Sequence, residues 1–186
     1  MEDFSSFCAA MGGETGRIMG ELLNSRADRH SLALTANSFG TALNEPTARE
    51  TIRKKLYPSI GSFYPAVVDQ LSKVDDDAKL VGVVSIYPLY RGIFEKYLNT
   101  SPEAFSLDDE FYKNEVMELE LAFESQAHMG VFYAYFKLKE QEIRNLVWIS
   151  ECVQQRMKSR IEEFVPIFSS QSPWRCEQTR RDGATR

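Results

Sequence analysis

The sequence has 186 residues, of which 43% are hydrophobic and 26% are charged, and its formal net charge is -5. This balance is typical of a soluble globular domain, and the acidic excess argues against a nucleic-acid partner, because such binding depends on basic side chains. The longest unbroken apolar run, over 131–136, is far shorter than the roughly 20 residues of a membrane span.

Helical periodicity dominates the chain from its N-terminus, and no convincing strand pattern is present. We expect a short amphipathic helix over residues 2–11, ended by a pair of glycines, because consecutive glycines break helices. A second helix is predicted over 14–36. A third is predicted over 46–56, since an asparagine precedes it as a possible cap and a proline stands in its first turn.

The dipeptide Tyr-Pro occurs three times in the middle of the chain, at residues 57–58, 64–65 and 87–88. Each proline disfavours the α conformation for the residue before it. The sequence therefore predicts short helices that are interrupted at Tyr-Pro corners. Their expected spans are roughly 65–73, 76–86 and 89–97.

Two longer helical patterns follow, over 107–128 and 131–165, and Gly130 marks a turn between them. Two consecutive helices joined by a short turn form an antiparallel hairpin. The predicted fold class is therefore all-α, with a long C-terminal antiparallel helix hairpin. We expect one all-helical domain over 1–168 and a disordered tail over 169–186, since the tail is polar, basic and aperiodic.

Large apolar side chains follow one face of the predicted helix 131–165, and a charged block interrupts that face at Lys139 and Glu140. A face that is simply solvated would not break an apolar stripe in this way. The apolar positions are Phe132, Phe136, Ile143, Leu146, Val147, Val153, Met157, Ile161 and Phe164.

The charged block has two interpretations, as exposed ion pairs or as a buried or interfacial polar network. Glu140 lies four residues before Arg144, and Lys139 lies three before Glu142, so both spacings allow ion pairs on a helix. Asn145 adds a donor and an acceptor that a polar network would use. The candidate structural or interface residues are Lys139, Glu140, Glu142, Arg144 and Asn145.

Candidates for enzyme chemistry are weaker. Glu124 and His128 share a helix face, but a ferritin-like metal site needs Glu-x-x-His twice and two further glutamates. We therefore expect no catalytic residue, no metal and no cofactor. An all-helical metal or small-molecule enzyme using Glu124, His128 and the 139–145 charges is an alternative. A cytosolic helical scaffold is another.

Several long motifs are similar to a known family. They are FCAAMGGETG at 7–16, ADRHSLALTANSFGTAL at 27–43, KLYPSIGSFYP at 55–65, FYKNEVMELELAF at 111–123, and GVFYAYFKLKEQEIRNLVWISECVQQR at 130–156. Together with VPIF at 165–168, they resemble the d subunits of the eukaryotic vacuolar-type proton ATPase. On this resemblance, the chain corresponds to the C-terminal half of the family and carries an unrelated C-terminal tail.

The resemblance implies a fragment of a helical funnel that links the central stalk of the ATPase to the membrane proteolipid ring. It implies a non-catalytic coupling subunit with other V-type ATPase subunits as partners, and with neither nucleic acid nor a small-molecule substrate. The expected location is peripheral, on the cytoplasmic face of vacuolar or other endomembranes. Surfaces that the rest of the funnel would cover should stay exposed, so the isolated chain is expected to aggregate or to need a partner.

Overall fold

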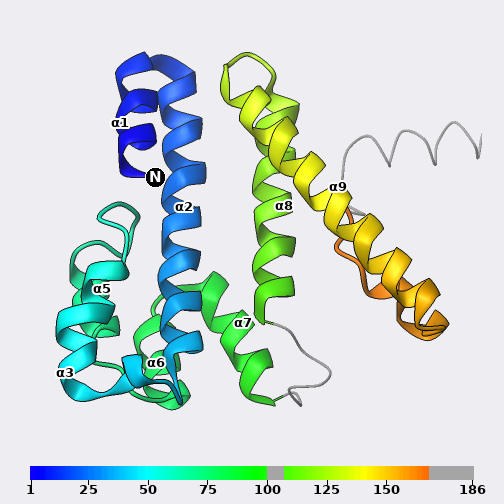
Figure 1. The fold of residues 1–186 in the computed structure, drawn as a ribbon. Helices are drawn as coiled ribbons and strands as arrows, with labels where there is room; N and C mark the ends of the chain where they lie inside the picture. The colour runs from blue at the N-terminus through cyan, green and yellow to red at the C-terminus, as the bar shows by residue number, and fades with distance from the viewer. Residues whose placement is uncertain (100–106, 168–186) are drawn as a thin grey trace, which may run out of the picture. The chain divides into compact units, whose positions relative to one another are not determined.

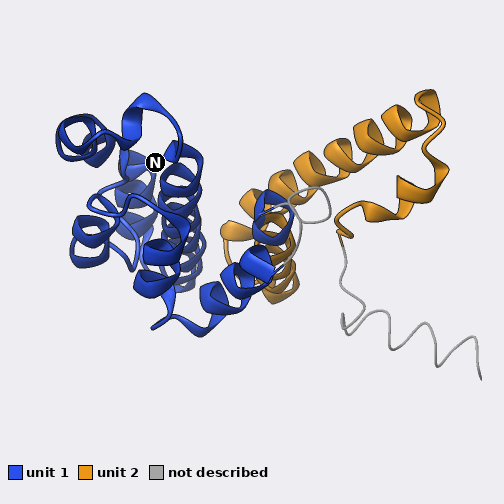
Figure 2. Ribbon diagram, turned by 90° about the horizontal axis from the view of Figure 1, so that it is seen from below, with its two compact units in different colours: residues 1–111 blue, residues 112–186 orange. Residues whose placement is uncertain are grey.

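The computed structural model describes residues 1–99 and 107–167 (Figure 1). These residues form helices and connecting turns with no β-strand among them, which confirms the predicted all-α class. The chain divides into two compact units, Met1–Phe111 and Tyr112–Arg186 (Figure 2). That boundary lies inside the expected domain 1–168, whose behaviour as one folding unit stays a prediction. The expected tail, 169–186, lies outside the described residues.

The first unit begins with α1 (Glu2–Met11) and α2 (Gly13–Ser38). Gly12 and Gly13 separate them with φ of 66° and 57°. Glycine adopts this left-handed region at little cost, so the predicted break occurs where the sequence placed it. α2 extends slightly beyond its predicted end, and Ser38 Oγ donates to the carbonyl of Thr35 in its last turn, at 2.7 Å.

A helical run over residues 46–56 follows a short 3₁₀ turn, η1 (Ala42–Asn44). The run has the predicted bounds, but it comprises three segments because a π-helical turn interrupts it. The segments are α3 (Pro46–Ala48), the π turn η2 (Arg49–Arg53) and α4 (Lys54–Leu56). Such turns recur at functional or strained places in helices, and nothing in the spacing of apolar residues predicted this one.

Three short helices complete the first unit, and each has a Tyr-Pro pair or an aspartate near its start. α5 (Ala66–Leu71) begins directly after the cis peptide between Tyr64 and Pro65, and α7 (Pro88–Asn99) begins with its proline. α6 (Asp77–Val84) is capped by Asp76, whose carboxylate accepts the amide of Lys79 at 2.7 Å. Each boundary is within a few residues of its predicted place.

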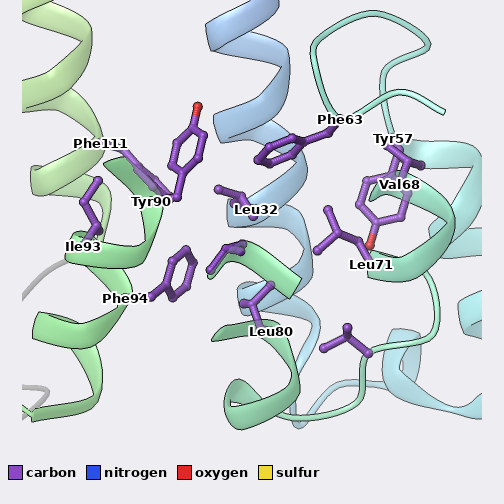
Figure 3. Packing of buried hydrophobic residues seen from close by; sticks show 12 residues of the cluster. Leu32, Tyr57, Phe63, Val68, Leu71, Leu80, Tyr90, Ile93, Phe94 and Phe111 are labelled. Atoms are coloured by element: carbon purple, nitrogen blue, oxygen red, sulfur yellow. The ribbon is translucent and has the colours of Figure 1, made fainter. Parts of the chain in front are cut away.

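The core of the first unit lies between α2 and the short helices. Figure 3 shows Leu32, from α2, among buried side chains from α5, α6 and α7. Aromatic rings fill the side toward α7. Phe63 lies 5.3 Å from Tyr90, and Phe94 lies 6.3 Å from Phe111, measured between ring centroids in edge-type geometry. At this core, α2, α5, α6 and α7 therefore turn large apolar side chains toward one another.

The second unit contains most of α8 (Leu107–Ser125), then α9 (Gly130–Gln154) and the 3₁₀ turn η3 (Lys158–Glu163). The prediction of one helix over 131–165 is therefore wrong in its last third. α9 ends because Arg156 takes a left-handed φ of 58°, and the amide of Met157 bonds to the carbonyl of Cys152 at 2.9 Å. This Schellman-type cap usually uses glycine, so no residue type at this position predicted it.

Candidate functional site

The two long helices of the second unit run antiparallel. The ring of Phe123, late in α8, lies 6.5 Å from the ring of Tyr135, early in α9. The guanidinium of Arg144, farther along α9, lies 4.3 Å from the ring centroid of Tyr112, early in α8. The end of α8 therefore lies near the start of α9, and the start of α8 lies near a later part of α9. This is the antiparallel order of the expected hairpin, although α9 is shorter than expected.

The buried face of α9 is narrow and made mostly of small or polar residues. Its members recur at helical spacing, so they form one face. Leu138 is the one large aliphatic residue among them. The buried residues are Gly130, Ala134, Leu138, Gln141, Asn145 and Cys152.

A polar network on this face fastens the segment after α9 to the helix. The side-chain amide of Gln141 donates to Asn145 Oδ1 at 3.0 Å, and Asn145 Nδ2 donates to the carbonyl of buried Val165 at 2.6 Å. One turn farther on, Trp148 Nε1 donates to the carbonyl of Arg160 at 3.1 Å. Asn145 thus takes part in a buried polar network of the kind considered from the sequence, and Gln141 is a member that the sequence reasoning missed.

The charged block divides between this network and the surface. Arg144 lies over Tyr112 and places Nη1 3.5 Å from Gln141 Oε1, so its partners differ from the Glu140 that spacing suggested. Glu140 pairs with Lys137 at 2.6 Å, and Lys139 pairs with Glu142. The hydrogen bond to Glu142 raises the pKa of the Lys139 ammonium. Exposed pairs of this kind contribute little to stability.

The opposite face of α9 carries large apolar side chains that are exposed. Six of them, with exposed fractions from 51% to 65%, form what we call the outer stripe. An amphipathic helix usually turns such a face toward its own core, so α9 has the reverse of the usual arrangement. The outer stripe comprises Phe132, Phe136, Ile143, Leu146, Val147 and Val153.

α1 also has an exposed apolar face, which belongs to the first unit. Phe4 and Phe7 stack on each other with centroids 6.5 Å apart, and Met1 and Met11 are exposed as well. The residue of α1 that is buried is Cys8. Each of the two units therefore has a helix with an exposed apolar face, and contiguous surfaces of this kind mark interfaces.

Arg53, on the π turn, is a buried cation that sequence reasoning missed. It is fully buried, and its guanidinium donates to the carbonyls of Leu71 at 2.8 Å and Ser72 at 3.1 Å, and to Ser38 Oγ at 2.8 Å. The last carbonyls of a helix lack partners within the helix, and a cation there is favoured by the helix dipole. Arg53 therefore satisfies the end of α5, and burial lowers the pKa of its guanidinium.

Asp28 holds a loop in a similar way. Its carboxylate accepts the backbone amides of Ser62 at 3.1 Å and Phe63 at 3.0 Å. A Cβ added at Gly61 would meet this carboxylate, so glycine is needed for the loop to approach α2. Burial raises the pKa of Asp28, an effect that the two amide hydrogen bonds reduce.

His128, which the sequence offers as a candidate for catalysis, contacts the backbone near the end of α8. His128 is buried, and its Nε2 lies 3.0 Å from the carbonyl of Ala122 near the end of α8. Across residues 1–99 and 107–167, no group of three or more His, Cys, Asp or Glu side chains is placed to hold a metal ion. None of the helices in these ranges has the length and apolar character needed to cross a membrane.

Comparisons with known proteins agree with the motifs noted above. The chain is 44% identical over 169 residues to "V-type proton ATPase subunit d" of Dictyostelium discoideum, and 48% identical over 165 residues to "V-type proton ATPase subunit d2" of Arabidopsis thaliana. It is 30% identical over 170 residues to the subunit d of Saccharomyces cerevisiae. These matches cover 89–90% of this chain and 45–46% of each relative.

The chain therefore spans about half the length of the curated relatives that it matches. The sequence profile described as "ATP synthase (C/AC39) subunit" matches residues 1–164, which include every helix among the described residues 1–99 and 107–167. The chain belongs to the ATP synthase (C/AC39) subunit family.

Proposed function

We propose that this chain acts as a non-catalytic coupling subunit of a vacuolar-type proton-transporting ATPase. The observation that carries the proposal is the similarity, over about nine-tenths of the chain, to proteins named V-type proton ATPase subunit d. In this role the chain links the central stalk to the membrane proteolipid ring, so that ATP hydrolysis elsewhere in the complex drives proton transport. Its place is peripheral, on the cytoplasmic face of the membrane.

The structure supports a mechanical role through its long helices. α2 has 26 residues and α9 has 25, so each is close to 40 Å long at about 1.5 Å per residue. The contact of Arg144 with Tyr112 and the bond of Asn145 to Val165 fasten α9 to neighbouring segments. A subunit that transmits torque needs such rigid elements, together with surfaces that bind other subunits.

In this proposal, the charged block contributes both to the rigidity of the hairpin and to a surface that binds another subunit. Arg144 and Asn145 keep the hairpin and the returning segment in register, because their contacts reach α8 and Val165. Lys139, Glu140 and Glu142 lie on the exposed side, where they contact a neighbouring subunit. None of these residues acts as an acid, base or nucleophile.

A chimeric subunit tests this function. Residues 1–164 replace the matching stretch of the Saccharomyces subunit d in cells that lack the endogenous subunit. The matched control carries the corresponding stretch of the Arabidopsis relative, which is 48% identical to this chain. Assembly of the complex, proton pumping by isolated vesicles and ATP hydrolysis by the detached catalytic sector are measured separately.

We expect the chimera to restore assembly and pumping as well as the control does, with hydrolysis by the detached sector unchanged in all strains. A chimera that is expressed but restores neither, while the Arabidopsis control restores both, would overturn the proposal. Metal bound stoichiometrically to the purified chain would instead favour the enzyme alternative.

A further inference from the structure

We infer that the π turn η2 is a conformational device that holds Arg49 and Arg53 against the connection between α5 and α6. Through these two side chains, the helical run over 46–56 fixes the direction in which α6 leaves α5. This role belongs to the first unit alone and goes beyond the coupling function proposed above.

The connection between α5 and α6 is buried although it lies outside both helices. Leu71, Ser72 and Val74 are 0%, 3% and 4% exposed. Buried carbonyls need hydrogen-bond partners, and a connection without regular structure cannot supply all of them itself. These carbonyls therefore need donors from elsewhere in the fold.

Three side chains from residues 44–53 supply those donors, and we call them the carbonyl clamp. Each of the five consecutive carbonyls over 71–75 accepts a hydrogen bond from the clamp, at 2.5–3.1 Å. The clamp consists of Asn44, which donates to Asp75, Arg49, which donates to Lys73, and Arg53, which donates to Leu71, Ser72 and Val74.

The central position of the clamp suits an arginine. Arg53 is 0% exposed, and its hydrogen bonds go to neutral oxygens, which are the three carbonyls, Ser38 Oγ at 2.8 Å and Asn44 Oδ1 at 3.4 Å. A guanidinium presents five donors in one plane, whereas the ammonium of a lysine presents three around a single nitrogen. One guanidinium can therefore bridge several carbonyls of the connection and the end of α2 together.

The π turn sets the register of the clamp. The amide of Lys54 bonds to the carbonyl of Arg49, five residues earlier, so the run contains one residue more than an uninterrupted α-helix would. Without that residue, the two halves of the run would be rotated by about 100° relative to each other. The later half is held in place, because the hydroxyl of buried Tyr57 lies 2.8 Å from Thr35 Oγ1. The additional residue therefore lets both ends of the clamp reach the connection.

Deletion of Ile52 tests the register in the full 186-residue chain. Ile52 lies in the π turn and is 52% exposed, so its removal shortens the turn without emptying the core. We expect a lower melting temperature and faster hydrogen exchange over residues 71–76. The matched control, Ile52→Ala, keeps the length of the turn and should differ little from the wild type in both measurements.

A double variant separates the register from a general loss of stability. If the additional residue serves to place Arg53, deletion of Ile52 should lower the melting temperature much less in the Arg53→Ala background than in the wild type. Costs that add fully would show that the π turn serves another purpose, and would overturn the inference.

Chemical rescue tests the cation. Arg53→Ala leaves a space lined by the carbonyl oxygens of the connection, which a small guanidinium compound can fill. Ethylguanidinium, at millimolar concentrations far below those that denature proteins, should bind this variant saturably and restore at least about half of its lost melting temperature. The wild type and Arg91→Ala, which alters an exposed arginine, should not respond.

Two further results would overturn the inference. One is a deletion variant with the melting temperature and hydrogen exchange of the wild type, and the other is a folded Arg53→Ala variant that does not bind ethylguanidinium. Arg53→Lys decides the case in which Arg53→Ala does not fold. It keeps the charge without the planar set of donors, so it should melt below the wild type and exchange faster over 71–76, and wild-type behaviour would contradict the role of the guanidinium.

Discussion

The core of the first unit and α9 of the second unit use their apolar residues in opposite ways. In the first unit, Leu32, Phe63 and Phe94 point into a shared core, and the charged group of Arg53 is buried with hydrogen-bond partners. In the second unit, α9 buries Asn145 in a polar network and exposes Phe136. The first unit therefore has a core that holds many of its large apolar side chains, whereas α9 leaves a row of them exposed.

The same kind of side chain should accordingly have different energetic value in the two units. Apolar burial stabilises a fold in proportion to the area removed from water. A phenylalanine of the core contributes to the stability of the chain, and a phenylalanine of the outer stripe contributes little, because it is largely exposed to water. The following predictions test this contrast, from the largest expected effect to the smallest.

Phe94→Ala and Phe136→Ala form the most direct pair. Phe94 is 0% exposed and Phe136 is 65% exposed. The first change should lower the free energy of unfolding by about 3–5 kcal/mol, because it removes buried area and leaves a cavity. The second should alter it by at most about 0.5 kcal/mol in the isolated chain. Urea titration of both variants measures the difference, and equal losses would contradict the contrast between the units.

Arg53→Met tests whether the first unit depends on its buried cation. The change keeps much of the side-chain volume but removes the arginine donor from the carbonyls of Ser72 and Val74. Unsatisfied buried groups cost about 1–3 kcal/mol each, so we expect a total loss of at least about 3 kcal/mol. Thermal and urea unfolding measure it. Arg91→Met is the control, because Arg91 is exposed and pairs with Glu95 on the surface, and it should have little effect.

Asn145→Ala tests the polar network of the second unit. Loss of the bonds to Gln141 and Val165 should cost about 1–2 kcal/mol and release the segment after α9. Faster hydrogen exchange over residues 157–167 is the specific readout. Glu142→Ala, in an ion pair on the surface, should leave that exchange unchanged. An unaltered segment in the Asn145 variant would show that its attachment depends on other contacts.

Arg144→Ala should have a small effect on stability and a larger one on coupling. Arg144 is exposed, so the loss of its contact with Tyr112 should cost at most about 1 kcal/mol. In the chimeric subunit, the variant should reduce assembly or proton pumping, because the hairpin loses a link between α8 and α9. Hydrolysis by the detached catalytic sector should not change, and a loss there would show that Arg144 has another role.

The pH dependence of stability should reveal the raised pKa of Asp28. Burial raises its pKa in the folded state, so the folded protein binds this proton more tightly than the unfolded chain. The stabilising contribution is therefore complete below about pH 4 and is lost as pH rises through the folded pKa. Wild-type stability should fall with pH in this window relative to Asp28→Asn. Urea titrations at several pH values compare the slopes, and parallel profiles would contradict the assignment.

The sequence alone determined the features that depend on local chemistry. The all-α class follows from apolar periodicity, and the break between α1 and α2 occurs at Gly12 and Gly13, where the backbone needs a left-handed conformation. The bounds of the helical run over 46–56 follow from a proline in its first turn and the Tyr-Pro pair after it. These signals act within a few residues of the structure that they specify, so they can be read from spacing alone.

Tertiary structure decided the partners of the polar groups and the orientation of the faces. α9 ends at Gln154 because Arg156 adopts a left-handed conformation that glycine usually occupies at the ends of helices. Arg144 contacts Tyr112, and Arg53 contacts the end of α5, because folding brings together segments that are 18 or more residues apart. Periodicity identified the apolar face of α9. Whether such a face is buried depends on which other surfaces the fold places against it. Contacts between residues distant in sequence determine those surfaces, so spacing alone cannot predict them.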